Sequence, residues 1–239
     1  MGTNFIPSTA INQLEMWQAA TFDTATIRRE LGWAADLGMN LMRVYLHDLL
    51  WEQDSAGLVA RMDRYLAISS ELGIKTMFVL FDDCWYGNAQ PGPQQVSTDP
   101  GMHNNYWLQS PRFAEVMDES AHPRLERYTK GVMRAFGQDP RVALWDIYNE
   151  PGNNHLPEVA LPLLKKVMTW ARETQPSQPL TTGVWRQERE YWEMMLFQIE
   201  NSDILTFHAY NDYEGTKNHC QPRQLWQAHD LYRIPGQGL

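Results

Sequence analysis

One glutamate stands at the point where a buried strand is expected to stop. Residues 143–154 read ALWDIYNEPGNN, so an apolar and aromatic run ends in Asn149, Glu150, Pro151 and Gly152. A carboxyl group at the edge of a core can give and take protons, which is the chemistry of a general acid and base. The alternative is a surface glutamate that opens a turn before Pro151. The choice depends on the side chains that the rest of the chain brings to Glu150.

Other apolar runs also end in polar, ionisable or aromatic side chains. In chain order these candidates are Arg43, His47, Asp82, Asp83, Trp85, Trp185, His208 and Tyr210. If the strands form a parallel barrel, their carboxyl ends open on one shared mouth. We therefore expect carboxylates, imidazoles, a guanidinium and indoles to converge with Asn149 and Glu150 on one pocket.

The elements that must position these residues alternate between helix and strand. The segments AADLGMNLMRVYLH and SSELGIKTMFVLFDD each run from a helix end through Leu-Gly into an apolar strand. Gly38 and Gly73 are the expected left-handed helix caps of this repeated unit. The predicted strands are Gly2–Pro7, Asn40–His47, Lys75–Asp82, Val142–Tyr148, Leu180–Trp185 and Ile204–Tyr210.

Apolar spacing marks two of the helices between these strands. Leu58, Met62 and Leu66 lie at i, i+4 spacing, and residues 156–173 place Leu163, Val167 and Trp170 on one stripe. Trp33, Trp145 and Trp170 are expected to serve packing, whereas tryptophans at strand ends could serve as platforms for sugar rings.

Alternating strands and helices predict an α/β fold with a parallel sheet. Continuous apolar strands such as TMFVLF suit a sheet covered on both faces, so we expect a (β/α)8 barrel of the TIM type, incomplete, with about six βα units. A doubly wound open sheet is the competing fold, but no GxGxxG or Walker loop follows a strand. The barrel domain is expected to span residues 1–213. Residues 214–239 lack a strand-like run and form an atypical tail, as in a chain cut short or continued in a foreign frame.

Charge and composition disfavour some classes of binding partner. A net charge of −9, with no long Lys/Arg cluster, disfavours nucleic acid and anionic membranes. No apolar stretch is long enough to span a bilayer, and MGTNFIPSTA has no signal-peptide pattern. Localisation is left open between cytoplasm, periplasm and secretion. Cys84 and Cys220 form no metal-binding pattern and are expected to be free thiols.

The segment WDIYNEP resembles the fourth-strand signature of the retaining glycoside hydrolases of the (β/α)8 clan that includes cellulases, β-mannanases and β-galactosidases. Further segments agree with the cellulase-like members that act on β-1,4-linked glycans. These are GTNFIPSTAINQLEMWQ, MRVYLHDLLWEQD, MFVLFDDCW, PSQPLTTGVW and ENSDILTFHAY. The resemblance covers about residues 2–213 and implies a β-linked oligosaccharide or polysaccharide as the partner, with no metal and no cofactor.

The resemblance also implies a role for each candidate residue. Glu150 would be the general acid and base, with a carboxyl group held protonated near neutral pH. Asn149 would hydrogen-bond the sugar 2-hydroxyl, and Arg43 would orient and ionise the nucleophilic carboxylate. The other residues would hold the substrate: His208 and Tyr210 at the substrate or nucleophile, Trp85 and Trp185 as stacking faces, and His47, Asp82 and Asp83 as hydrogen-bonding groups of the subsites.

Strand geometry places a condition on this assignment. Successive side chains of a strand point to opposite faces, so regular alternation would separate Asn149 from Glu150. Both reach one site only if the strand twists or bulges at its end, as the resemblance implies.

One part of the family pattern is missing. The family's nucleophile is a glutamate at the end of strand seven, and retaining chemistry places it roughly 5–5.5 Å from the acid. The last glutamate here, Glu214, comes only four residues after Tyr210, too early for another βα unit. We therefore expect a chain that stops before strand seven, with negligible turnover and open sheet edges that favour self-association.

Two other functions compete with an active glycosidase. A catalytically inactive glycan-binding barrel fragment would explain the missing nucleophile. A metal-dependent barrel hydrolase or isomerase could use His47, Asp82 and Asp83 as ligands, although no HxH pair ends the first strand.

Overall fold

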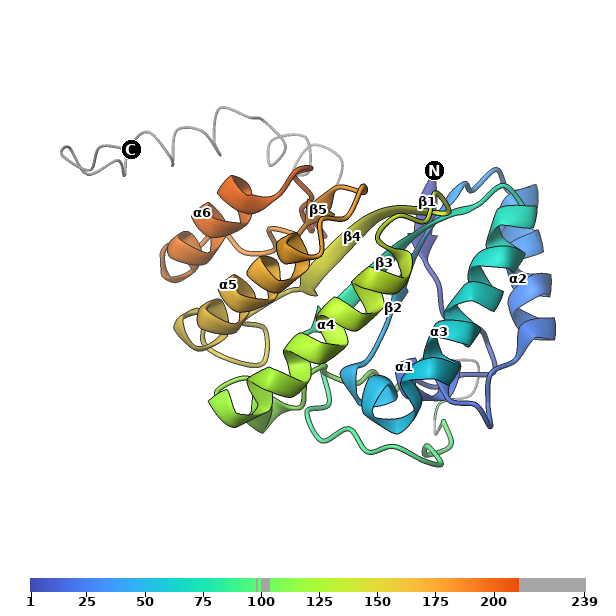
Figure 1. The fold of residues 1–239 in the computed structure, drawn as a ribbon, viewed down its shortest axis with the longest axis horizontal. Helices are drawn as coiled ribbons and strands as arrows, with labels where there is room; N and C mark the ends of the chain where they lie inside the picture. The colour runs from blue at the N-terminus through green and yellow to red at the C-terminus, as the bar shows by residue number, and fades with distance from the viewer. Residues whose placement is uncertain (98, 100–103, 211–239) are drawn as a thin grey trace.

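Five parallel strands form one sheet in the order β1-β2-β3-β4-β5 (Figure 1). The computed structural model describes residues 1–97, 99 and 104–210. The expected tail, with Glu214 and Cys220, lies outside these residues. The strands are β1 (Gly2–Asn4), β2 (Leu41–Tyr45), β3 (Lys75–Asp82), β4 (Val142–Asn149) and β5 (Leu180–Thr181).

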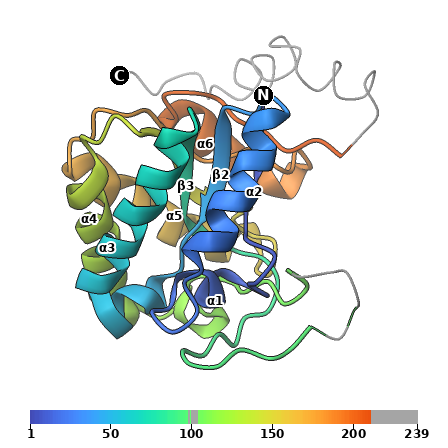
Figure 2. The same cartoon turned by 90° about the vertical axis from the view of Figure 1, so that its right-hand side faces the viewer.

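Helices connect the strands in the sequence that a barrel requires. They are α1 (Gln13–Trp17), α2 (Thr24–Asp36), α3 (Asp48–Glu71), α4 (His122–Phe136), α5 (Pro157–Glu173) and α6 (Trp192–Asn201), with 3-10 turns η1 (Phe113–Glu115), η2 (Glu119–Ala121) and η3 (Arg189–Tyr191). Figures 1 and 2 show α3, α4 and α5 side by side against the sheet, and α2 beside α3. This βα arrangement is the predicted incomplete barrel.

The predicted strands differ from the observed ones mainly at the two ends of the sheet. The third strand has its predicted bounds, and the second and fourth differ by one or two residues at an end. The first strand is shorter than the predicted Gly2–Pro7. The fifth ends at Thr181, and Val184 then forms one isolated parallel bridge with Phe207.

The predicted sixth strand, Ile204–Tyr210, is wrong as a regular strand. Its pairing consists of the Val184 amide donating to the Thr206 carbonyl at 2.9 Å and the His208 amide donating to the Val184 carbonyl at 2.8 Å. A strand pairs only as far as its neighbour continues, and β5 offers only this one further residue. The segment nevertheless runs parallel beside β5, where a sixth strand would lie.

Local signals placed the helix ends and the core as expected. Gly38 and Gly73 have φ of +79° and +73°, the left-handed conformation that a glycine cap adopts without a steric penalty. The predicted stripes of α3 and α5 are buried. Phe78 of β3 packs against Trp145 of β4 at a ring distance of 5.7 Å.

The expectation that Trp33 serves packing is wrong. Its side chain is 57% exposed on α2, whereas Trp145 and Trp170 are buried as expected. The guanidinium of Arg29 lies over the Trp33 ring at 5.3 Å. Spacing along a helix shows which residues share a face but not whether another element covers that face.

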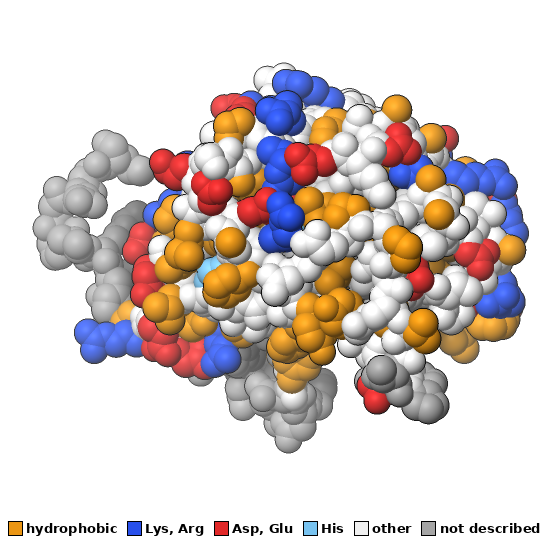
Figure 3. All heavy atoms as spheres, turned by 90° about the horizontal axis from the view of Figure 1, so that it is seen from below, with side chains coloured by type: hydrophobic (Ala, Val, Ile, Leu, Met, Phe, Trp, Pro, Cys, Tyr) orange, Lys and Arg blue, Asp and Glu red, His pale blue; other side chains and the backbone are white. Residues whose placement is uncertain are grey.

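Charge is mixed on the side of the molecule below the view of Figure 1. The 3-10 turns η1 and η2 follow β3 in the chain, and Figure 3 shows acidic and basic side chains interspersed with hydrophobic ones. None of the helices in the described ranges is long and apolar enough to cross a bilayer.

A buried ion pair ties the start of α3 to α4 and to the segment after β3. The carboxylate of Asp48 pairs with the guanidinium of Arg124 and accepts a hydrogen bond from the Ser110 hydroxyl at 2.7 Å. Burial alone would raise the pKa of Asp48, but His47 and Arg124 lower it well below its usual value. Asp48 is therefore charged inside the protein and depends on these partners.

Arg124→Met is expected to lower the free energy of unfolding by about 3–5 kcal/mol, because it leaves the Asp48 carboxylate buried without its cation. The matched control is Lys165→Met, which breaks the exposed pair with Glu193 and should cost less than about 1 kcal/mol. Urea unfolding followed by circular dichroism measures both. Equal losses in the two variants would contradict the role given to the buried pair.

Candidate active site

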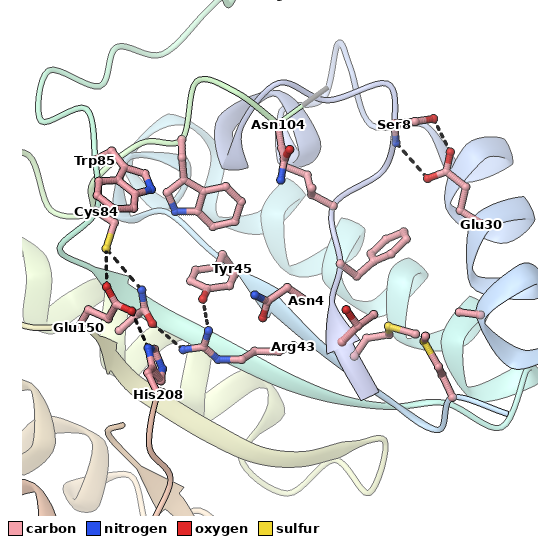
Figure 4. Close-up of a pocket in the computed structure, with 18 of the residues that line it drawn as sticks. Asn4, Ser8, Glu30, Arg43, Tyr45, Cys84, Trp85, Asn104, Glu150 and His208 are labelled. Carbon is pink, nitrogen blue, oxygen red and sulfur yellow. Dashed lines mark hydrogen bonds and ion pairs between the residues drawn. The ribbon is translucent and has the colours of Figure 1, made fainter. Parts of the chain in front are cut away.

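A cleft of about 680 Å³ lies at the carboxyl ends of the strands (Figure 4). Its polar end is formed by Arg43, Cys84, Asn149, Glu150, His208 and Tyr210, and its aromatic wall by Tyr45, Trp85 and Trp107. Its other end is apolar and follows β1 and α2, with Phe5, Ile6, Trp33, Ala34, Leu37 and Met39. Polar groups from β2, from the ends of β3 and β4 and from the segment 204–210 thus meet in one place.

Glu150 enters the cleft because the backbone turns sharply after β4. Its φ is +44°, in the left-handed region that residues other than glycine rarely adopt. This conformation ends the alternation of the strand, so Asn149 and Glu150 both line the cleft. The required distortion of the strand end is therefore present, and it lies at Glu150 itself. Unusual backbone of this kind occurs often at functional sites.

Three polar groups contact the Glu150 carboxylate. His208 Nδ1 lies 2.6 Å from Oε1, while Asn153 Nδ2 at 2.6 Å and Cys84 Sγ at 3.3 Å approach Oε2. Burial raises the pKa of the Cys84 thiol, and the carboxylates of Asp82 and Glu150 raise it further, so the thiol is protonated and donates. All three contacts stabilise an ionised carboxylate.

The expectation that Glu150 is held protonated near neutral pH is wrong for the described residues. Burial would raise its pKa, but His208, Cys84 and Asn153 outweigh burial and lower the pKa below its ordinary value. The physical reason is that hydrogen-bond donors surround the carboxylate. A like charge nearby is what raises the pKa of one member of a carboxylate pair.

Arg43 combines a structural role with a position at the cleft. Its guanidinium pairs with the buried carboxylate of Asp146 and contacts the Tyr45 hydroxyl. It also donates to Asn149 Oδ1 at 2.8 Å, while Asn149 Nδ2 donates to Asp82 Oδ1 at 2.7 Å. These two bonds fix the orientation of the Asn149 amide at the cleft.

His47, Asp82 and Asp83 lie behind the cleft wall rather than in its lining. His47 Nδ1 lies 3.2 Å from the Leu49 amide nitrogen and 3.2 Å from Asp48 Oδ1 at the start of α3. Asp82 bonds Asn149 and the Trp107 indole, and Asp83 bonds His155. All three side chains are buried, so the predicted contact with a sugar would require them to be uncovered. As placed, they hold the residues around the cleft.

Burial also perturbs the charge state of Asp82. Desolvation raises its pKa to about 7, although bonds from Asn149 and Trp107 and the charge of Arg43 act in the opposite direction. Its protonation therefore changes within the physiological range.

The predicted aromatic platforms fall in different places. Trp85 is 63% exposed and lines the cleft, and Tyr210 is 92% exposed at its edge. Trp185 is half-buried outside the cleft lining, where its indole donates to the Pro151 carbonyl at 3.0 Å and packs edge-on against Tyr191. Its predicted stacking role stays a prediction.

Sequence reasoning missed four residues of the site, Tyr45, Cys84, Trp107 and Asn153, of which Cys84 was expected only as a free thiol. Tyr45 lies two residues after Arg43 on β2, so strand alternation could have found it. Trp107 and Asn153 lie in loops, and no local pattern marks a loop residue that reaches the site through tertiary contacts. Among the described residues no three His, Cys, Asp or Glu side chains are grouped as metal ligands, and the expected independence from metal stays a prediction.

Comparison with known proteins adds a family match. The protein-family model described as Cellulase (glycosyl hydrolase family 5) matches residues 9–233 of the sequence. No curated protein matches the sequence significantly.

Solved structures with a similar fold include a mannosidase and two mannanases. An exo-β-1,4-mannosidase of Opitutaceae bacterium strain TAV5 has a TM-score of 0.58 at 19% identity over 80% of this chain and 33% of its own. A hyperthermostable endo-1,4-β-D-mannanase of Thermotoga petrophila RKU-1 has a TM-score of 0.56 at 15% identity, and the match covers 97% of this chain and 74% of the mannanase. A β-mannanase of the blue mussel Mytilus edulis has a TM-score of 0.57 at 16% identity, and the match covers 88% of this chain and 70% of that protein. At these identities the likeness concerns the fold, and the chain spans a third of the mannosidase's length.

His208→Phe is expected to raise the pKa of Glu150, because it removes a donor that lies 2.6 Å from the carboxylate and leaves burial less opposed. Carbon-13 NMR titration of the glutamate carboxyl groups measures the change. His122→Phe on α4 is the control and should leave the Glu150 titration in place. An unchanged Glu150 pKa in His208→Phe would show that the 2.6 Å contact does not govern the carboxylate.

Asp82 is expected to make stability depend on pH. Its folded pKa lies above its unfolded value, so its contribution is fully present below about pH 4 and is lost as the pH rises through about 7. Between pH 5 and pH 8 the wild type should lose about 2–3 kcal/mol more unfolding free energy than Asp82→Asn. Urea titrations at both pH values test this, with exposed Asp36→Asn as a control that keeps the wild-type difference. The same difference in Asp82→Asn would refute the assignment.

Proposed function

The chain belongs to the cellulase family, glycosyl hydrolase family 5, and on that premise we propose that it hydrolyses β-1,4-linked glycans at the cleft around Glu150. The observation that carries the proposal is the meeting of Glu150, His208, Asn149 and Arg43 at one end of this cleft. The names of the structurally similar mannosidase and mannanases make β-mannosides the first substrates to test.

The proposed reaction retains the configuration of the sugar in two steps. Glu150 protonates the glycosidic oxygen while a carboxylate nucleophile attacks the anomeric carbon, so the C–O bond breaks and a covalent glycosyl-enzyme forms. Glu150 then removes a proton from water, which attacks the anomeric carbon and releases the carboxylate. Asn149 would bind the sugar 2-hydroxyl, and Trp85 and Tyr210 would contact sugar rings from the aromatic side of the cleft.

The nucleophile is proposed to come from outside the described residues. Within them, the carboxylates that line the cleft are Glu150 and Glu30, and Glu30 lies on α2, where it accepts a hydrogen bond from the Ser8 amide at 3.0 Å (Figure 4). A second carboxylate about 5–5.5 Å from Glu150 would also raise the pKa of Glu150 by charge repulsion, which a general acid needs. The same carboxylate would thus act as the nucleophile and keep Glu150 protonated.

Two proteins test this proposal together: the 239-residue chain, and the chain carrying two more βα units of which the first ends in glutamate. We expect negligible hydrolysis of an aryl β-mannoside and of β-1,4-mannotriose by the first and measurable turnover by the second. In the extended protein, Glu150→Gln should lower turnover of mannotriose by about 10²–10⁴-fold, because its leaving group needs a proton. Glu30→Gln is the matched control and should keep most of the activity.

The outcomes separate the candidate functions. Hydrolysis by the 239-residue chain that Glu150→Gln leaves unchanged would overturn the acid assignment. Binding of mannotriose by calorimetry without turnover in the extended protein would favour a glycan-binding fragment. Stoichiometric metal in purified protein, removed with loss of binding, would favour the metal-dependent hydrolase.

A further inference from the structure

A second buried pair, Asp83 with His155, lies behind the cleft and has no part in the proposed bond-breaking steps. Asp83 follows β3 directly, and His155 lies in the segment between Glu150 and α5. Asp83 Oδ1 and His155 Nδ1 are 2.9 Å apart, with side-chain exposures of 0% and 2%. A buried pair at this distance needs a proton between the two atoms.

Hydrogen-bond partners define how many protons the pair holds. His155 Nε2 lies 2.9 Å from the Phe113 carbonyl oxygen, which only accepts, so Nε2 carries a proton. Asp83 accepts from Gln109 Nε2 at 2.6 Å and from the Gly152 amide at 2.8 Å. Because the carboxylate already accepts from these two donors, we place the shared proton on Nδ1, so the pair contains two protons and is neutral as a unit.

The pair also holds the backbone that carries Glu150. Around Asp83, the Gly152 amide donates to the carboxylate, the Asn154 amide donates to the Asp83 carbonyl at 3.2 Å, and the Asp83 amide donates to the Asn149 carbonyl at 3.1 Å. Asn153, between the two clamped amides, donates to Glu150 Oε2. The position of the Glu150 carboxylate therefore depends on residues 150–156 staying against Asp83.

His155 is fixed from its other side as well. Its ring stacks on Phe113 with centroids 4.1 Å apart and planes at 20°. The side chain of Asn154 bridges the Trp85 carbonyl and Gln109 Oε1, each at 2.9 Å. The contacts therefore join three segments that are distant in the sequence: the end of β3, the loop before η1, and the loop after β4.

We propose that Asp83 and His155 are positioning residues that form a two-proton clamp on residues 150–156 and so hold Glu150 in its left-handed conformation at the cleft. Loss of the shared proton leaves the Nδ1 lone pair facing the carboxylate oxygen, and this repulsion releases the segment. The effect on hydrolysis rests on the proposed function, whereas the clamp itself does not.

The charge environment agrees with this assignment. Burial would lower the pKa of His155, but Asp83 and the Phe113 carbonyl raise it above its ordinary value. Asp83 is the titratable group that faces the His155 ring. The charge of Asp83 also acts on Tyr148 of β4 and Tyr191 of η3. Arg112, next to Phe113 in the chain, is paired with Glu115. The stabilising contribution of a histidine with a raised pKa is fully present below about pH 6.5 and is lost as the pH rises through the folded value.

Amide hydrogen exchange of Gly152 and Asn154 tests the clamp in the 239-residue chain without any activity assay. In the wild type, nitrogen-15 spectra of the His155 ring should show both ring nitrogens protonated at pH 6. The protection factors of the two amides should fall at least about tenfold as His155 titrates. The wild-type titration needs no variant, so it decides the proposal even where a variant fails to fold.

Variants then separate the clamp from general packing. His155→Phe keeps a ring to stack on Phe113 but removes both hydrogen bonds, and His155→Gln restores one donor. Protection of Gly152 should be low at all pH values in His155→Phe and intermediate in His155→Gln. His122→Phe, at a site with the same 8% exposure, should behave as the wild type.

Two results would overturn the clamp: a His155 ring with one proton at pH 6, or Gly152 protection in His155→Phe equal to that of the wild type. In the extended protein, His155→Gln should lower kcat more than it raises KM. Altered exchange without any enzyme activity would leave the clamp standing and count against the proposed function alone.

Discussion

Two consecutive buried carboxylates at the end of β3 organise everything around the cleft. Because strand side chains alternate, Asp82 and Asp83 point to different sides and recruit different partners. Asp82 accepts from Asn149 and the Trp107 indole, which both line the cleft. Asp83 accepts from Gly152, Gln109 and His155, which hold the loop after β4. A buried carboxylate without donors costs several kcal/mol, so these partners are obligatory.

The charges at the barrel mouth form a connected set rather than isolated pairs. Arg43 is bonded to Asp146 and to Asn149, which in turn is bonded to Asp82. His208 and Glu150 form a second pair at the same end of the cleft. Burial raises the pKa of Asp82 to about 7 against the opposing effect of its network partners, whereas at Glu150 the contacts from His208, Cys84 and Asn153 outweigh burial and lower the pKa. An added carboxylate would act on Glu150 directly.

The fold gives this site one well-ordered side and one open side. β3 and β4 are the longest strands, and their ends carry the buried network. The cleft continues past β1 to α2, where Trp33 and Leu37 are exposed. Extended apolar exposure is characteristic of surfaces that another element or partner covers. The predicted self-association through open edges stays a prediction, and the short β1, with three residues, offers few unpaired groups.

The sequence by itself determined the βα repeat, the glycine caps at Gly38 and Gly73, the buried stripes of α3 and α5 and the gathering of Arg43, Asn149, Glu150 and His208. These follow from local rules, since periodicity and cap chemistry act over a few residues and parallel strands share one end. Only the tertiary structure decided that Glu150 adopts a positive φ, that Asp83 faces His155 rather than the cleft, and that Trp107 reaches Asp82 from a loop. It also decided that Trp33 is uncovered and that residues 204–210 form one bridge instead of a strand. Each of these depends on contacts between segments far apart in the chain, and neither a residue's type nor its immediate neighbours encode which distant segment will lie against it.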